Sequence, residues 1–291
     1  MSVSILIVNY RSYDELEQCL VSLRDFEPDT RIVIVDHAAD VRRAAQLQPL
    51  HPRVEIHQFQ DNPGFGAGVN RAARLAAPDD VVVLNPDVVL TQAIVARLVS
   101  YVGSQPRVGI VGGLVREESG ALQPSARAFP DLSTAFGGRT ALLTRLWPSN
   151  PLTVRNLASS AVAHPDRVDW VTGAFMFIRR QTFDDVGGFD ERFFMYWEDA
   201  DLCRRAAARG WQTAFFPSVS VRHLTGRASR HVPIRTLVAF HRSVFHYYWK
   251  HGGPVARVLS PIVALGLAGR FVLRLPAALR TALSRAPERH L

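Results

Sequence analysis

Short apolar runs alternate with amphipathic segments through the first third of the chain, and this alternation constrains the fold more than any other feature. Residues 3–8 (VSILIV), 31–35 (RIVIV) and 81–84 (VVVL) are almost wholly apolar, as is typical of strands that are buried on both faces. Residues 54–59 form a weaker run of the same kind. The order predicts a doubly wound α/β domain, with a mostly parallel sheet flanked by helices.

Local signals predict where several helices begin. Ser12, with Glu15 three positions later, matches a capping box at the start of a helix. Thr91 is in position to cap a helix after the last of the early strands. Further helices are expected at about 67–76 and at 199–209, the latter closed by Gly210.

Polar residues stand just beyond three of the predicted strands. They are Tyr10, Asp36 and Asp87. Taken singly, either aspartate could equally be a turn or capping residue. In an open α/β sheet, however, ligands bind beyond the carboxyl ends of the strands, so the shared position favours ligand contact.

A glycine-rich segment, residues 61–71 (DNPGFGAGVNR), precedes a predicted helix. Gly64, Gly66 and Gly68 would allow the backbone to approach a phosphate closely, and Asn70 could reach the same ligand. The spacing is not that of a dinucleotide-binding or P-loop motif, so the segment alone is a weak indication.

The stretch 168–203 combines a buried strand, a glycine pair and an aromatic run with a cluster of acids. The aromatic residues are Phe193, Phe194, Tyr196 and Trp197, and the acids are Glu198, Asp199 and Asp201. Acids beside a tyrosine and a tryptophan at a helix start suit a general base next to a platform for a sugar ring. Asp201 points elsewhere on the helix and is expected to pair with Arg204 or Arg205.

The segment between residues 112 and 165 is rich in glycine, proline, serine and arginine, and it is expected to be a binding loop or lid. Arg127 lies in it and is a candidate contact for an anionic acceptor, although a solvated arginine fits equally well. His223 ends a later predicted strand, and the sequence leaves a structural role and a metal-binding role open.

The charge of the chain favours anionic partners. The formal net charge is +8, and Lys250 is the only lysine, so arginine supplies nearly all of the positive charge. Nucleic acid is not expected as a partner, because the arginines are scattered and no recognition motif appears. Cys19 and Cys203 are too few for a disulfide framework and indicate a reducing compartment. The N-terminal residues do not have the pattern of a secretory leader, so secretion is not expected.

The C-terminal tail differs from the rest of the chain. Residues 258–269 are apolar but contain Pro261, and the sequence predicts a segment too short to span a membrane. Arginines follow it. We expect a basic amphipathic segment that lies in an anionic membrane surface. A helix docked on the core, or a contact in a homodimer, would also fit.

Taken together, the motifs resemble those of family-2 glycosyltransferases with the GT-A fold, of the rhamnosyltransferase type. The motifs are SILIVNYRS, IVIVDHAAD, DNPGFGAGVN, VLNPDVVL, VTGAFMFIRR and GGFDERFFMYWEDADLC. Two short loops, PSAR and WPSNP, further resemble members that extend decaprenyl-diphosphate-linked N-acetylglucosamine in actinobacterial wall assembly, at the arabinogalactan linker. The resemblance implies a catalytic domain at 1–232, with a donor half to about 112 and an acceptor half from 113, and a helical extension at 233–291.

The resemblance also implies roles for individual residues in an inverting transfer of a deoxyhexose, L-rhamnose from dTDP-rhamnose. Asp199 would be the general base, and the helix N-terminus would keep its carboxylate ionised. Asp87 and His223 would hold Mg²⁺ or Mn²⁺ on the donor diphosphate. The donor would contact Val8, Asn9, Tyr10, Asp36, Gly66, Asn70, Asn85 and Asp87. The acceptor, a polyprenyl-diphosphate-linked N-acetylglucosamine, would contact Arg127, Trp197 and Glu198. The enzyme would be peripheral, at the cytoplasmic face of the cell membrane.

Two positions depart from the family pattern. Asn85 replaces the first acid of the D-x-D motif, which removes one anionic metal ligand. His37 replaces the usual asparagine after Asp36, which leaves the nucleobase of the donor open. A transferase that uses a UDP-sugar and a polysaccharide acceptor, and a non-catalytic membrane-binding module, are the alternatives.

Overall fold

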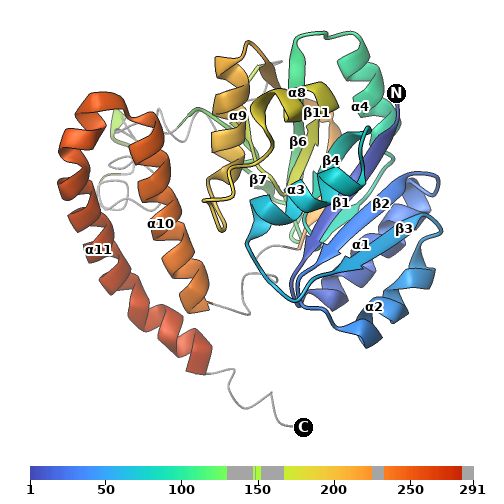
Figure 1. The fold of residues 1–291 in the computed structure, drawn as a ribbon, viewed down its shortest axis with the longest axis horizontal. Coiled ribbons are helices and arrows are strands. Elements are labelled where there is room, and N and C mark those ends of the chain that lie inside the picture. The colour runs from blue at the N-terminus through green and yellow to red at the C-terminus, as the bar shows by residue number, and fades with distance from the viewer. Residues whose placement is uncertain (130–146, 148, 152–166, 225–232, 284–291) are drawn as a thin grey trace.

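The computed structural model describes residues 1–129, 147, 149–151, 167–224 and 233–283 of the chain, and it is built around one mixed sheet (Figure 1). In spatial order the strands are β3 (Val54–Gln58), β2 (Arg31–Asp36), β1 (Val3–Asn9), β4 (Asp80–Leu84), β10 (Phe175–Ile178), β6 (Val108–Glu117), β11 (Gln212–His223) and β5 (Val88–Leu90). A short strand, β7 (Leu122–Gln123), pairs with β6, and β8 (Ala126–Arg127) pairs with β9 (Trp170–Val171) in a separate ribbon.

The first four strands of this order run parallel, as the sequence predicts, and the other half of the sheet is mixed. β10 lies antiparallel between β4 and β6, and β11 runs parallel to β6 but antiparallel to β5. The late strand β10 therefore joins the two halves of the sheet. Through it, residues around 173–178 lie directly beside the end of β4.

Helices cover both faces of the sheet, which is why its strands are apolar on both sides. The helices in the described part of the chain are α1 (Tyr13–Phe26), α2 (Val41–Leu47), the short η1 (Gln48–Leu50), α3 (Phe65–Leu75), α4 (Val95–Gly103), α8 (Arg180–Val186), α9 (Glu198–Ala208), α10 (Pro233–His251) and α11 (Gly253–Leu283). Ile5 and Ile7 share a cluster with residues of α1 and α4, whereas Leu6 and Val8 share one with α3, α8 and α9. The expected α/β architecture is confirmed.

The two predicted caps differ in outcome. Helix α1 begins directly after Ser12, as predicted, but Ser12 Oγ makes no hydrogen bond to any described residue, and the backbone N–H of Ser12 donates to Asn9 Oδ1 (3.1 Å). Helix α4 begins at Val95 rather than after Thr91, and Glu27 Oε1 accepts the N–H groups of Ile94 and Val95 at 2.6 and 2.8 Å. That carboxylate is remote in sequence, so no local pattern could reveal it.

The last two helices, α10 and α11, form a pair beside the sheet body, with α10 facing α9 (Figure 1). The expectation that the apolar tail is too short to span a membrane is wrong about its length. Residues 258–269 lie inside the long helix α11, which continues through Pro261 and Pro276. Its stretch Gly253–Arg280 is long and apolar enough to cross a bilayer, judged by length and composition alone, and the apolar window is not buried.

Candidate functional site

Asp36 is held at the carboxyl edge of the sheet by a network of donors. Its carboxylate is 1 % exposed and accepts hydrogen bonds from Asn9 Nδ2 (2.9 Å), Tyr13 Oη (2.7 Å) and Gln58 Nε2 (3.3 Å). Burial, together with the hydrogen bond to Asp36, raises the pKa of Tyr13, so its hydroxyl stays a donor. Tyr10 follows the strand and is half-buried.

The side chain of Asn9 is fully buried, and both its oxygen and its nitrogen bond within the protein, to Ser12 N–H and to Asp36. Asn9 therefore orients Asp36, and a direct contact with the donor stays a prediction. Val8 is also buried, at 9 % exposure, and its side chain lies against Gly68.

Asp87 and His223 are brought together from positions far apart in the sequence. Asp87 Oδ1 lies 3.0 Å from His223 Nε2, and both side chains are buried. His223 Nδ1 lies 2.9 Å from Gln123 Oε1, which can accept a hydrogen bond from it. With the proton on Nδ1, the lone pair of Nε2 can bind a metal, an arrangement common for histidine ligands.

These two residues fit part of a Mg²⁺ or Mn²⁺ site. Two ligand atoms at about 2.1 Å from one octahedral cation lie roughly 3 Å apart when adjacent, as these two atoms do. Among the described residues, no third histidine, cysteine, aspartate or glutamate completes a protein-only site. Mg²⁺ sites commonly use one or two carboxylates and take their other ligands from substrate phosphates and water.

The first turn of helix α9 carries Glu198, Asp199 and Asp201, and we call it the acid turn. Asp199 Oδ2 accepts the N–H of Gly173 (3.0 Å), and Asp199 Oδ1 accepts the N–H of Ala200 (2.8 Å). The carbonyl of Ala174, next to Gly173, accepts the N–H of Asn85 (3.1 Å). The chain at 173–174 thus connects Asp199 to the segment that carries Asp87.

Burial acts against the helix N-terminus at Asp199. Burial raises the pKa of this carboxyl group, even though the N–H groups of Gly173 and Ala200 and the charge of Arg127 act to lower it. The helix terminus is therefore not strong enough to hold the pKa at its ordinary value. A raised pKa makes the carboxylate a stronger base once it has lost its proton.

The three predicted acceptor residues, Glu198, Arg127 and Trp197, have different surroundings. Burial, with the charge of Asp199, raises the pKa of Glu198 well above its ordinary value, and Glu198 Oε2 makes no hydrogen bond within the described structure. Arg127 lies on β8 with its guanidinium over the ring of Trp170, and its charge acts on Asp199. Trp197 packs on Tyr247 of α10, with ring centroids 5.2 Å apart.

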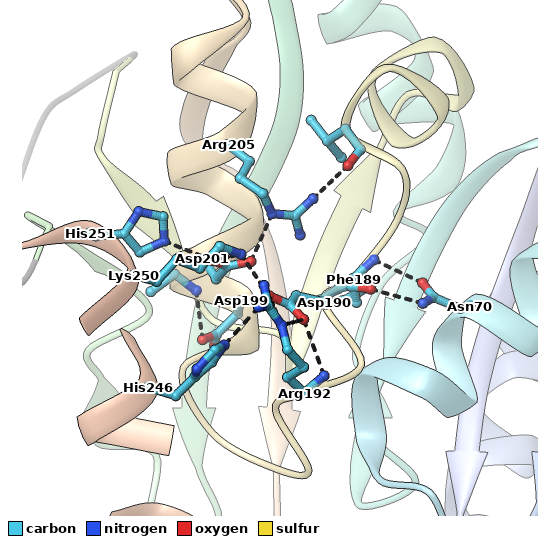
Figure 2. Close-up of polar contacts among 12 residues, drawn as sticks. Asn70, Phe189, Asp190, Arg192, Asp199, Asp201, Arg205, His246, Lys250 and His251 are labelled. Carbon is cyan, nitrogen blue, oxygen red and sulfur yellow. Dashed lines mark hydrogen bonds and ion pairs between the residues drawn. The ribbon is translucent and has the colours of Figure 1, made fainter. Parts of the chain in front are cut away.

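The glycine-rich segment packs on the protein itself. A side chain at Gly66 would meet Phe189, and the amide of Asn70 is bonded on both sides: Nδ2 to Phe189 O and Glu191 Oε1, each at 2.9 Å, and Oδ1 to Phe189 N at 2.8 Å. Figure 2 shows Asn70 and Phe189 facing each other. These contacts join α3 to the 187–191 turn, and the contact of Gly66 and Asn70 with a donor stays a prediction.

Sequence reasoning missed several contributors to the site. Gly173 holds Asp199 through its backbone, Gln123 contacts the imidazole of His223, and Tyr13 and Gln58 bind Asp36. No local pattern marks any of them, because each acts on a residue that is distant in sequence. The predicted binding loop lies largely outside the described residues, which omit 130–146, 148 and 152–166.

Comparison with known proteins identifies the family. The family model described as "Glycosyltransferase like family 2" matches residues 2–237. The N-acetylglucosaminyl-diphospho-decaprenol L-rhamnosyltransferase of Mycobacterium tuberculosis is 31 % identical, over 99 % of this chain and 96 % of its own. The rhamnosyltransferase WbbL of Escherichia coli is 26 % identical, over 84 % of this chain and 92 % of its own.

Solved structures support the fold. The mannosyltransferase PcManGT of Pyrobaculum calidifontis, in complex with GDP-Man and Mn²⁺, superposes with a TM-score of 0.57 at 19 % identity, covering 97 % of this chain and 73 % of its own. TarS of Staphylococcus aureus (residues 1–349) superposes with a TM-score of 0.55 at 13 % identity, over 92 % and 80 %. The architecture is therefore the GT-A-like fold that the motifs suggested.

Proposed function

The chain belongs to glycosyltransferase family 2, and from this premise we propose that it moves L-rhamnose from dTDP-rhamnose onto a polyprenyl-diphosphate-linked N-acetylglucosamine. The relative from M. tuberculosis, which aligns along nearly the whole chain, bears the name of that transfer, and the E. coli relative is also named a rhamnosyltransferase. We keep the division into a catalytic domain at 1–232 and an extension at 233–291, and a homodimer, as predictions.

The observation that carries the proposal is the connection between Asp199 and the donor edge of the sheet. Asp199 is bonded to Gly173, and the neighbouring Ala174 is bonded to Asn85, two residues before Asp87. A direct displacement at the anomeric carbon needs one base for the hydroxyl proton of the acceptor, and Asp199 would supply it. A glycosidase would normally need two carboxylates that flank the scissile bond.

Donor binding would use the edge formed by β2, β1 and β4. Asp36, oriented by Asn9, would accept from the nucleoside, and Tyr10 would lie beside the base. Asp87 and His223 would hold a divalent cation that neutralises charge on the departing diphosphate. Arg127 and Glu198 would contact the acceptor on the opposite side, next to Asp199.

The pH dependence of transfer should report on Asp199 and its neighbour Arg127. Because the base must be deprotonated, kcat should rise with pH through the pKa of Asp199, which lies above the ordinary value for an aspartate. The charge of Arg127 lowers this pKa, so Arg127→Met should move the acidic limb of the kcat profile to higher pH. Rates of transfer measured from pH 4 to pH 9 would test this; a limb that stays in place contradicts the electrostatic link.

Peripheral attachment at the cytoplasmic membrane face belongs to the same proposal, because a polyprenyl acceptor stays in the bilayer. One side of α11 presents exposed apolar residues: Val255, Val258, Ile262, Leu265, Val272 and Leu273. Arginines flank this stripe along the helix, which suits anionic lipid head groups.

Vesicle binding should therefore depend on the α11 stripe. We expect the double variant Ile262→Asp, Leu265→Asp to lose most of its co-sedimentation with vesicles that contain anionic phospholipid, because two charges would enter the acyl boundary. Val41→Asp, an equally exposed apolar residue on α2, is the matched control and should bind like the wild type. Unchanged binding by the double variant would contradict a membrane role for α11.

A further inference from the structure

We propose that α10 holds the acid turn in its working geometry, and that Lys250 is the positioning residue that pins α10 to it. The inference rests on the proposed role of Asp199 as the base. It goes beyond that role because it makes the C-terminal helices part of the catalytic apparatus, in addition to their proposed contact with a membrane.

Helix α10 contacts every residue of the aromatic run that leads into the acid turn. The pairs are Phe193 with His246, Phe194 with Arg235, the carbonyl of Met195 with Ser243 Oγ, Tyr196 with Phe240, and Trp197 with Tyr247. The contacts are spread along most of the helix, and the Ser243 bond to the backbone is 2.8 Å long. The main chain just before Glu198 is therefore fixed by α10.

That main chain is strained and needs such support. Tyr196 and Trp197 both have a φ angle of +70°, in the left-handed region that bulky side chains rarely adopt. Two consecutive residues of this kind persist only where the surrounding structure holds them. The strained pair sets the direction in which α9 begins, and hence where the Asp199 carboxylate points.

Buried charge fastens the end of α10 to the same turn (Figure 2). Lys250 Nζ lies 2.7 Å from Asp190 Oδ2 and 2.6 Å from Asp201 Oδ1. The only lysine of the chain therefore joins a residue before the aromatic run to a residue after it. His251 Nε2 also contacts Asp201 Oδ1 (2.7 Å), while Arg205 Nε holds its other oxygen (2.7 Å).

Asp201 is therefore more than the partner of an arginine. It has no exposed side-chain surface and sits on the first turn of α9, two residues after Asp199. Burial alone would raise the pKa of Asp201, but the hydrogen bonds and charges of His251, Arg205 and Lys250 hold it below its ordinary value. The carboxylate stays charged and keeps the two helices together.

If Lys250 had a purely structural role, its loss would lower the stability of the fold and change nothing else. The positioning role predicts instead that its loss lowers kcat and leaves donor affinity unchanged. Asp36 ends β2, and Asp87 lies between β4 and β5. The contacts of α10 described above involve neither residue, so donor binding should be preserved when α10 loosens. The acid turn should shift, and a displacement of about 1 Å at a reacting group can cost up to roughly 100-fold in rate.

The test compares Lys250→Met with Lys250→Arg and Arg31→Met in the full-length protein. Arg31 begins β2, at the end away from Asp36, and forms a partly buried ion pair with Glu55 through two hydrogen bonds. Arg31→Met therefore controls for the loss of stability that removal of an ion pair causes. All kcat values are measured well below each melting temperature, with the dissociation constant for dTDP and Mn²⁺ measured by calorimetry.

We expect Lys250→Met to lower kcat by about 10-fold to 100-fold with the dTDP affinity unchanged, Lys250→Arg to recover most of the loss, and Arg31→Met to keep the wild-type kcat. A Lys250→Met enzyme within two-fold of the wild-type kcat would overturn the inference, as would a parallel loss of dTDP affinity. Failure of the proposed function itself would be distinguishable, because the wild type would then show no transfer.

Discussion

Replacement of Asp199 by asparagine is expected to lower kcat by about 10² to 10⁴-fold, the contribution typical of a positioned general base. The amide keeps the size of the carboxylate and can still accept the N–H of Gly173 or Ala200, so the acid turn should keep its shape. What is lost is the basic carboxylate oxygen that takes the proton from the acceptor hydroxyl. Initial rates of transfer, with donor affinity measured separately, would show this separation.

The matched control for this variant is Asp184→Asn. Asp184 is an exposed aspartate on α8 that pairs with Arg180 one helical turn earlier, and it lies outside the proposed site. Its kcat should equal that of the wild type. An Asp199→Asn enzyme that retains more than a tenth of the wild-type kcat, with unchanged donor affinity, would remove Asp199 as the base.

Asp87→Ala is expected to have an effect of similar size on the donor side. Lewis-acid stabilisation of a leaving diphosphate is worth several kcal/mol, so kcat/KM should fall by roughly 10³-fold or more. His223→Ala should cause a smaller loss, because the carboxylate remains. The direct readout is Mn²⁺ binding in the presence of dTDP, which should be strong in the wild type and weak in Asp87→Ala.

Metal removal provides the complementary experiment. An excess of chelator should abolish transfer by the wild type, and added Mg²⁺ or Mn²⁺ should restore it. Asp29→Ala, which removes an exposed aspartate between α1 and β2, is the control for a general change in charge. Full activity in chelator, or equal Mn²⁺ binding by Asp87→Ala and the wild type, would contradict the metal site.

The sequence predicted those parts of the molecule that depend on local pattern. The apolar runs identified β1, β2 and β4 nearly to the residue, because strands covered on both faces have no polar alternation to obscure them. The alignment of Asp36 and Asp87 with strand ends placed both at one edge of the sheet. The pairing of Asp201 with Arg205 was also correct, since both lie on one helix, four residues apart.

Interactions between distant segments lay beyond local patterns. Glu27 caps α4 in place of Thr91, and Asn70 binds the 187–191 turn, which is more than 110 residues away in the sequence. Residues 258–269 contain a proline, which suggested a short segment, yet Pro261 lies within a continuous helix. In each case the local structure depends on tertiary packing, which the spacing of residues along the chain does not show.

The burial of Asp199 shows the same limit for electrostatics. A helix N-terminus stabilises a carboxylate, and that rule predicted that Asp199 stays ionised. Desolvation of the half-buried side chain, which lies against Gly173, works in the opposite direction and is the largest influence on the pKa. The balance between the two depends on tertiary packing, which the sequence pattern does not show.

The proposed transfer of rhamnose from a dTDP donor to a lipid-diphosphate-linked N-acetylglucosamine can be tested directly. The purified full-length protein is incubated with that acceptor, Mg²⁺ and either dTDP-rhamnose or UDP-sugars, and the lipid product is followed by mass spectrometry. We predict a product heavier by one deoxyhexose, formed only from dTDP-rhamnose. A glycosylated lipid formed only from a UDP-sugar, or no glycosylated lipid from any donor, would contradict the account.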